Sequence, residues 1–92
     1  MQPPGADLVA RGIADLRDRR ETQEALLVSI GAPRLRMLGV AVPRAIPEPE
    51  HRLYTLLARD EVDAAHGRYN ALVRRLVSYE RALAKRTSAP AV

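Results

Sequence analysis

The chain has 92 residues, of which 47% are hydrophobic, and it carries a formal net charge of +4 at pH 7. This length allows one small domain with a modest core, and the patterned apolar content excludes a largely disordered chain. The lack of Cys excludes a disulfide framework and a thiolate metal site, while a charge of +4 does not by itself require an anionic partner.

The first predicted helix covers residues 7–30 and follows a segment, 1–6, that we expect to be disordered. Asp7 can cap this helix through its side-chain oxygen. Residues 17–24 are polar all round, yet opposite charges four residues apart support a helix there, each pair by about 0.2–0.5 kcal/mol. Gly31, two residues before a Pro, predicts the end of the helix. The apolar stripe of this helix comprises Val9, Ile13, Leu16, Leu27 and Ile30.

Residues 31–48 form the predicted connection between two helices, and they are too apolar for a purely solvated loop. Pro33 can open a short helix that runs to Gly39 and is followed by an extended linker. Alternatively, residues 34–42 form an extended strand, which would need a partner strand from another subunit. We favour the short helix and the linker.

The second predicted helix covers residues 49–86, and a short frayed tail is expected at 87–92. Pro49 suits the first turn of a helix, and Glu50 beside it complements the helix dipole. Unbroken, this helix would be about 57 Å long, whereas a compact domain of this size has a radius of gyration of about 12 Å. Either the helix breaks, most simply at Asp60, or another copy of the chain covers its ends.

An a/d pattern runs along the second half of this helix, with residues spaced alternately three and four apart. We call these seven residues the seam: Val62, Ala65, Tyr69, Leu72, Leu76, Tyr79 and Leu83. A seam of this kind packs either on the first helix of the same chain or on a second chain. Because residues 17–24 are polar, the first helix cannot cover the seam along its whole length. We therefore predict that the seam is the interface of a homo-oligomer, most simply a dimer, or of contact with another protein.

The C-terminal end of the chain is strongly basic, because Glu80 is the one acidic residue between Gly67 and Val92. Five of its cations are candidate contacts for an anion or a nucleic acid: Arg68, Arg74, Arg75, Arg81 and Lys85. Such a stripe can follow a phosphate backbone. The alternative is a solvated face whose cations suit the helix C-terminus. The aromatic residues are not interleaved with the cations as stacking platforms would be.

Motifs for catalysis, metal binding or a cofactor are missing from the sequence. The five Gly are scattered rather than gathered in a phosphate loop, and neither His stands in a nucleophile motif. Asp63 and His66 are three residues apart, as in the metal sites of helix bundles, but the remaining ligands of such a site are missing. We expect a solvated surface pair there, with no bound metal and no cofactor.

These elements predict an all-α fold with a single domain at residues 7–86: a helical hairpin or small bundle of two long helices, joined by an apolar Pro-rich connection and completed by oligomerisation. The leading functional hypothesis is a non-enzymatic interaction or assembly protein that presents helices to a protein partner. The alternatives are a small nucleic-acid-binding or regulatory protein and, less favoured, a helical enzyme with a site between subunits.

The composition also bears on where the protein works. No stretch approaches the roughly 18 uncharged apolar residues of a membrane span, and the first residues lack the pattern of a signal peptide. We therefore expect a cytoplasmic protein with no membrane partner. Fourteen of the fifteen basic residues are Arg and fifteen residues are Ala, which indicates a GC-rich coding sequence of a bacterium or its phage.

Overall fold

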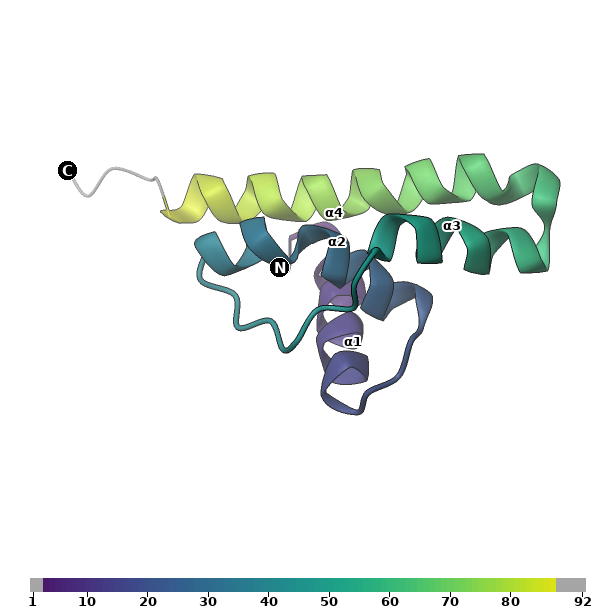
Figure 1. The fold of residues 1–92 in the computed structure, drawn as a ribbon. Helices are drawn as coiled ribbons and strands as arrows, with labels where there is room; N and C mark the ends of the chain where they lie inside the picture. Colours follow the sequence, from purple (N-terminus) through teal and green to yellow (C-terminus); the bar gives the residue numbers. More distant parts are fainter. Residues whose placement is uncertain (1–2, 88–92) are drawn as a thin grey trace.

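The computed structural model describes residues 3–87, in which all regular secondary structure is helical and no strand occurs (Figure 1). The all-α prediction is confirmed for this part of the chain. The elements are α1 (Ala6–Arg17), α2 (Gln23–Met37), α3 (Pro49–Asp60), a 3-10 turn η1 (Val62–Ala64) and α4 (Ala65–Thr87). No helix among them is long and apolar enough to cross a membrane.

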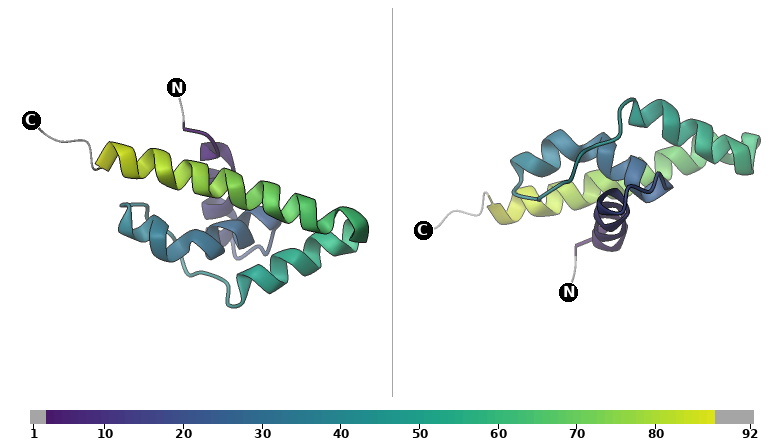
Figure 2. Two further views of the ribbon diagram at one scale, coloured as in Figure 1. Left: turned by 90° about the horizontal axis from the view of Figure 1, so that it is seen from above. Right: turned by 60° about the horizontal axis from the view of Figure 1, so that its bottom comes forward.

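The longest helix, α4, forms the long axis of a molecule that measures 50 × 26 × 22 Å. α3 folds back antiparallel along the first half of α4, and α2 runs beside the second half in the same direction as α4 (Figures 1 and 2). α1 crosses beneath α2 at a steep angle. Two shorter helices in tandem therefore cover α4, in place of one long partner.

The predicted continuous helix over residues 7–30 is wrong, because the chain turns between α1 and α2. Arg19 adopts a left-handed backbone conformation, with φ of 59°. Thr22 then caps α2, since its hydroxyl accepts a hydrogen bond from the Ala25 N–H at 3.1 Å. The turn lets the apolar face of α1 pack on α2. That burial outweighs the charge pairs on which a continuous helix would depend, each worth about 0.2–0.5 kcal/mol.

Asp7 does not cap α1, contrary to the prediction. The N-cap is Gly5, whose φ of 80° is readily adopted by glycine, and Asp7 instead forms an ion pair with Arg75 of α4 at 3.4 Å. The segment 1–6, predicted to be disordered, belongs to the folded body from its third residue on. Its first two residues lie outside the described residues, as does the predicted tail 87–92 beyond its first residue.

α2 continues past its predicted end through Gly31 and Pro33. Gly31 is buried where α2 meets α4, and a Cβ there would lie 3.0 Å from a carboxylate oxygen of Glu80 and from Leu76. Pro33 removes one backbone N–H, but its ring is exposed to solvent. The short helix predicted to start at Pro33 therefore exists as the end of α2, and the strand alternative for residues 34–42 is wrong.

The loop at residues 38–48 is irregular, but two side chains of α2 hold it to the helix by hydrogen bonds. The Ser29 hydroxyl accepts a hydrogen bond from the Ile46 N–H at 3.0 Å. The Arg36 guanidinium donates to two loop carbonyls, at 3.3 and 2.9 Å. These bonds hold the loop against the helix, as its apolar composition predicts.

The helix predicted over residues 49–86 is broken at Asp60, which was one of the two alternatives that its length left open. α3 begins at Pro49, with Glu50 in its first turn, and ends at Asp60. The turn η1 then reverses the chain so that α4 packs on α3, where the ring centroids of Tyr54 and Tyr69 lie 5.9 Å apart. Asp60 is thus the last residue of α3 and not the cap of a new helix.

Gly12 sets how closely α1 and α2 approach each other. A Cβ at this position would lie 2.4 Å from the Glu24 carbonyl oxygen and from a Val28 methyl group. We expect Gly12→Ala to push the helices apart and to lower the free energy of unfolding by about 1–3 kcal/mol. Urea unfolding followed by circular dichroism measures this change.

Gly67→Ala is the matched control, because Gly67 lies inside α4 with nothing within 4 Å of an added Cβ. It should raise the free energy of unfolding by up to about 1 kcal/mol through helix propensity alone. A Gly12→Ala protein as stable as the wild type would contradict the close crossing of α1 and α2.

Candidate functional site

The seam faces the protein's own interior along most of its length. Ala65 and Leu76 are 0% and 3% exposed. Four further seam residues are half-buried and pack on the same core: Tyr69, Leu72, Tyr79 and Leu83. Val62, in the turn between α3 and α4, is 73% exposed. The chain therefore supplies its own cover for the seam at every position except Val62.

The seam is covered because buried residues of α2, rather than the polar residues 17–24, pack against most of it. Residues 17–24 form the turn between α1 and α2 and the start of α2, whereas residues 25–35 of α2 are mostly buried and lie between the other helices. The polar character of residues 17–24 therefore gives no ground to expect a second chain at the seam. Pairing of two chains through the seam stays a prediction.

Glu80 is the acidic residue within the basic end of α4, and it is only 6% exposed. Its carboxylate packs over Gly31 of α2. Burial raises the pKa of the Glu80 carboxyl group, and the positive charge of Arg34 partly offsets this shift. The Glu80 side chain is therefore packed against α2 and does not lie on the outer surface of α4.

All five predicted anion contacts on α4 are exposed, but the structure divides them into two groups. Arg68 pairs with Asp60 at 3.7 Å, and Arg75 pairs with Asp7 at 3.4 Å. The other three have no carboxylate oxygen within 4.0 Å in residues 3–87: Arg74, Arg81 and Lys85. Of the five predicted contacts, only these three are available for an anionic partner without breaking an ion pair in residues 3–87.

The three cations without an ion pair form a row, which we call the outer row: Arg74, Arg81 and Lys85. At about 100° per residue they fall within an arc of about 40° around α4, and about 16 Å of helix separates the first from the last. Arg75 lies on a different flank of α4, beside α1. The outer row thus presents one continuous edge of positive charge.

The structure brings no third ligand to Asp63 and His66. Both residues are exposed, and the His66 ring shares a hydrogen bond of 3.2 Å with the Asn70 side chain. Within residues 3–87, no group of three or more His, Cys, Asp or Glu side chains could hold a metal ion.

A second group of cations was not predictable from the sequence, because the turn between α1 and α2 assembles it. Arg17 and Arg19 line a groove together with Arg44 from the loop. Arg44 follows Arg19 by 25 residues in the sequence, and no periodicity links the two. The composition of the turn, rich in Arg, was the available signal.

The outer row and the groove each present positively charged hydrogen-bond donors, the guanidinium and ammonium groups of Arg and Lys. Such groups bind oxyanions more strongly than neutral ligands. No protein-family model, curated protein or solved structure matches this chain. Its function is therefore inferred from the geometry and charge of its own residues.

Because the pKa of Glu80 is raised, we expect the free energy of unfolding to depend on pH. Because the folded-state pKa lies above the unfolded value, the folded protein binds this proton more tightly, and the associated stability is lost as pH rises through the folded pKa. We expect Glu80→Gln to match the wild type below pH about 4 and to unfold a few degrees higher at pH about 7. Thermal unfolding at the two pH values measures the difference.

The control for this measurement is Glu50→Gln, because Glu50 is an exposed residue in the first turn of α3. It removes the same charge from the surface and should not raise the unfolding temperature at neutral pH. A lower unfolding temperature for Glu80→Gln at neutral pH would contradict the account of Glu80 as a carboxylate that burial destabilises.

Proposed function

We propose that this protein is a non-enzymatic nucleic-acid-binding protein that holds a phosphate backbone along the outer row of α4. The observation that carries the proposal is that this row exposes three cations on one flank, with no carboxylate oxygen within 4.0 Å in residues 3–87. Arg68 and Arg75 are paired with Asp60 and Asp7, and the Glu80 side chain is buried against α2. Positive potential is therefore concentrated at the outer row.

The side chains available favour contact with phosphate over contact with bases. A guanidinium group donates two parallel hydrogen bonds to a phosphate, and the Lys ammonium acts as a point charge. The three Tyr lie elsewhere: Tyr54 and Tyr69 contact each other between α3 and α4, and Tyr79 packs on the core. Without stacking rings, we expect little sequence preference and a strong dependence of affinity on salt.

The test is a salt titration of binding to a fluorescent duplex of random sequence and to a single strand of the same length. With three phosphate contacts, the logarithm of the association constant should fall against the logarithm of salt concentration with a slope of about −2.7 for the duplex. Arg74→Gln with Arg81→Gln should reduce the magnitude of this slope by about 2 and weaken binding to any sequence alike.

The matched control is Arg68→Gln with Arg75→Gln, which removes the same charge from the same helix. Because these two groups are already paired with Asp60 and Asp7, their loss should change affinity far less. Absence of binding at low salt, or an equal loss of affinity in both double variants, would rule out the outer row as the contact surface.

Self-association is a second candidate function, and exposed apolar side chains support it. Val62 is 73% exposed at the turn between α3 and α4, Tyr54 on α3 is 40% exposed, and Met37 at the end of α2 is 84% exposed. Burial of such groups is the usual gain from pairing two chains. Val62 is the one exposed member of the seam, so it is the position at which a second chain would meet the seam.

Sedimentation velocity over a range of protein concentrations tests self-association. If the turn at Val62 forms the contact, Val62→Ser should shift the protein towards monomer, whereas Met37→Ser at the opposite end should not. Leu76 is unsuitable for this test, because it is 3% exposed and a charge there would disrupt the core. A wild-type protein that stays monomeric at all concentrations would exclude this function.

A further inference from the structure

A groove of about 590 Å³ lies between the α1–α2 turn and the loop at residues 38–48. Its volume is within the range of about 300–1,000 Å³ that small-molecule sites occupy. The floor is apolar: Leu16 is buried, Ile46 is half-buried, and Pro43 forms part of the wall. The groove is therefore large enough and apolar enough to hold the body of a small organic molecule.

Hydrogen bonds fix both walls of the groove. On one side, the Thr22 hydroxyl donates to a carboxylate oxygen of Asp15 at 2.6 Å, which fastens the α1–α2 turn. On the other side, Ser29 holds the loop at Ile46, and Arg36 holds it through two loop carbonyls. A site with both walls held in place costs little ordering when a ligand binds.

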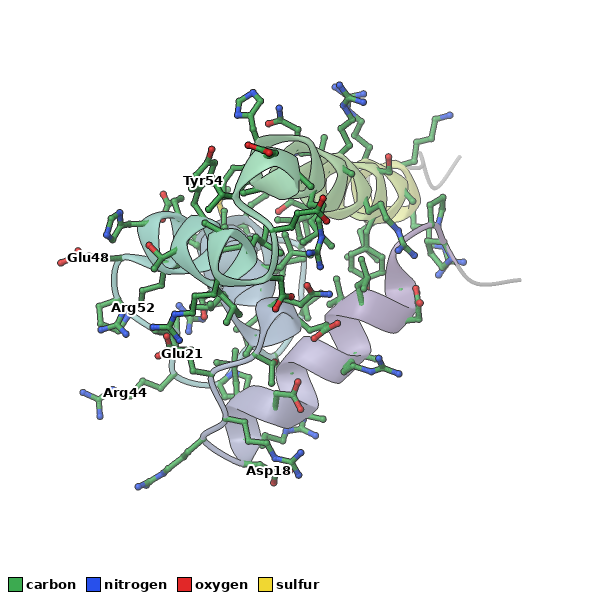
Figure 3. All side chains as sticks on the ribbon, turned by 90° about the vertical axis from the view of Figure 1, so that its right-hand side faces the viewer. Asp18, Glu21, Arg44, Glu48, Arg52 and Tyr54 are labelled. Atoms are coloured by element: carbon green, nitrogen blue, oxygen red, sulfur yellow. The ribbon has the colours of Figure 1, made fainter. Side chains whose placement is uncertain are left out.

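Charge at the mouth of the groove is positive after ion pairs are taken into account. Arg20 pairs with Asp18 at 3.5 Å, and Glu21 pairs with Arg52 at 3.1 Å. Figure 3 shows Glu21 and Arg52 side by side, with Arg44 extended outward on the same edge of the molecule. Three lining cations have no carboxylate oxygen within 4.0 Å in residues 3–87: Arg17, Arg19 and Arg44.

The backbone of the α1–α2 turn positions Arg19. Its φ of 59° lies in the left-handed region, where a residue with a side chain costs about 1–2 kcal/mol relative to the right-handed conformation and where glycine has no such cost. The chain nevertheless places an Arg at this point of the turn, beside the groove. This conformation ends α1 in a Schellman motif, in which the Arg20 N–H donates to the Asp15 carbonyl oxygen at 2.8 Å and the Arg19 N–H donates to the Leu16 carbonyl oxygen at 3.1 Å. The end of the helix thereby fixes the position of Arg19 at the edge of the groove.

We propose that this groove binds a small organic anion: an apolar body that lies on the floor, with a carboxylate, sulfonate or phosphate group held by Arg17, Arg19 and Arg44. Guanidinium groups bind such oxyanions through paired hydrogen bonds, and the apolar floor accounts for the body of the ligand. None of these residues belongs to the outer row of α4, so the proposal stands independently of nucleic-acid binding.

The probes are anilinonaphthalene sulfonate, which has an apolar body and one anionic group, and phenylnaphthylamine, which has the same body without the charge. Wild-type protein should bind the sulfonate at least tenfold more tightly than the neutral probe, by fluorescence titration. Arg17→Gln with Arg44→Gln should weaken binding of the sulfonate about tenfold or more, because two charge-assisted hydrogen-bond donors are lost. Affinity for the neutral probe should not change.

The matched control is Arg11→Gln with Arg59→Gln, which removes the same charge from exposed positions outside the groove. Its affinity for the sulfonate should equal that of the wild type. Equal affinity of the wild type for the two probes, or an equal loss in both double variants, would overturn the proposal.

Amide chemical shifts of the wild-type protein provide a readout that does not depend on any variant. The sulfonate should shift the amides of Arg19, Ala45 and Ile46, which lie along the groove. Shifts confined to α4 or spread over the whole core would instead show that the probe binds elsewhere, and the proposal would be wrong.

Discussion

The burial of α2 among the other three described helices is the constraint on which the rest of the structure depends. α2 contacts α1, α3 and α4, and its residues from Ala25 to Leu35 are mostly buried. A helix that is apolar nearly all round can be stable only when it is covered on several sides. Gly12 of α1 and Gly31 of α2 permit the required close approach, because a Cβ at either position meets atoms of the neighbouring helix. The turn after α1 lets α1 pack on α2, and the break after α3 lets both α3 and α4 pack on α2.

Covering α2 determines what remains on the surface. α4 gives one face to α2 and α3, and this face takes up nearly all the seam and also Glu80. What is left on the outside of α4 is polar and mostly basic. The exposed charge of the protein is therefore a consequence of core packing as well as of composition. A protein with a net charge of only +4 can in this way present three cations with no carboxylate oxygen within 4.0 Å in residues 3–87.

Local signals in the sequence predicted the helical class and the start of α3, and long-range packing decided the rest. The helical class, the start at Pro49 and the break near Asp60 follow from patterns within a few residues. The separation of α1 from α2 could not be predicted in this way, because charge pairs within 17–24 favour a helix locally and only the burial of α2 outweighs them. The continuous apolar character of residues 25–35 was the available clue, since it indicates a central helix rather than one half of a hairpin.

For the candidate sites, too, local sequence signals indicated some features and long-range packing decided others. That the five cations of α4 are exposed could be predicted, but their division into paired and free groups could not. Arg75 meets Asp7, a residue 68 positions away, and Arg68 meets Asp60 across the turn between two helices. In the groove, likewise, Arg20 and Glu21 are paired while their neighbours are not. A free cation binds an oxyanion without first giving up a carboxylate, so the pattern of ion pairs, as well as the number of Arg, bears on which surfaces of this protein we propose for anion binding.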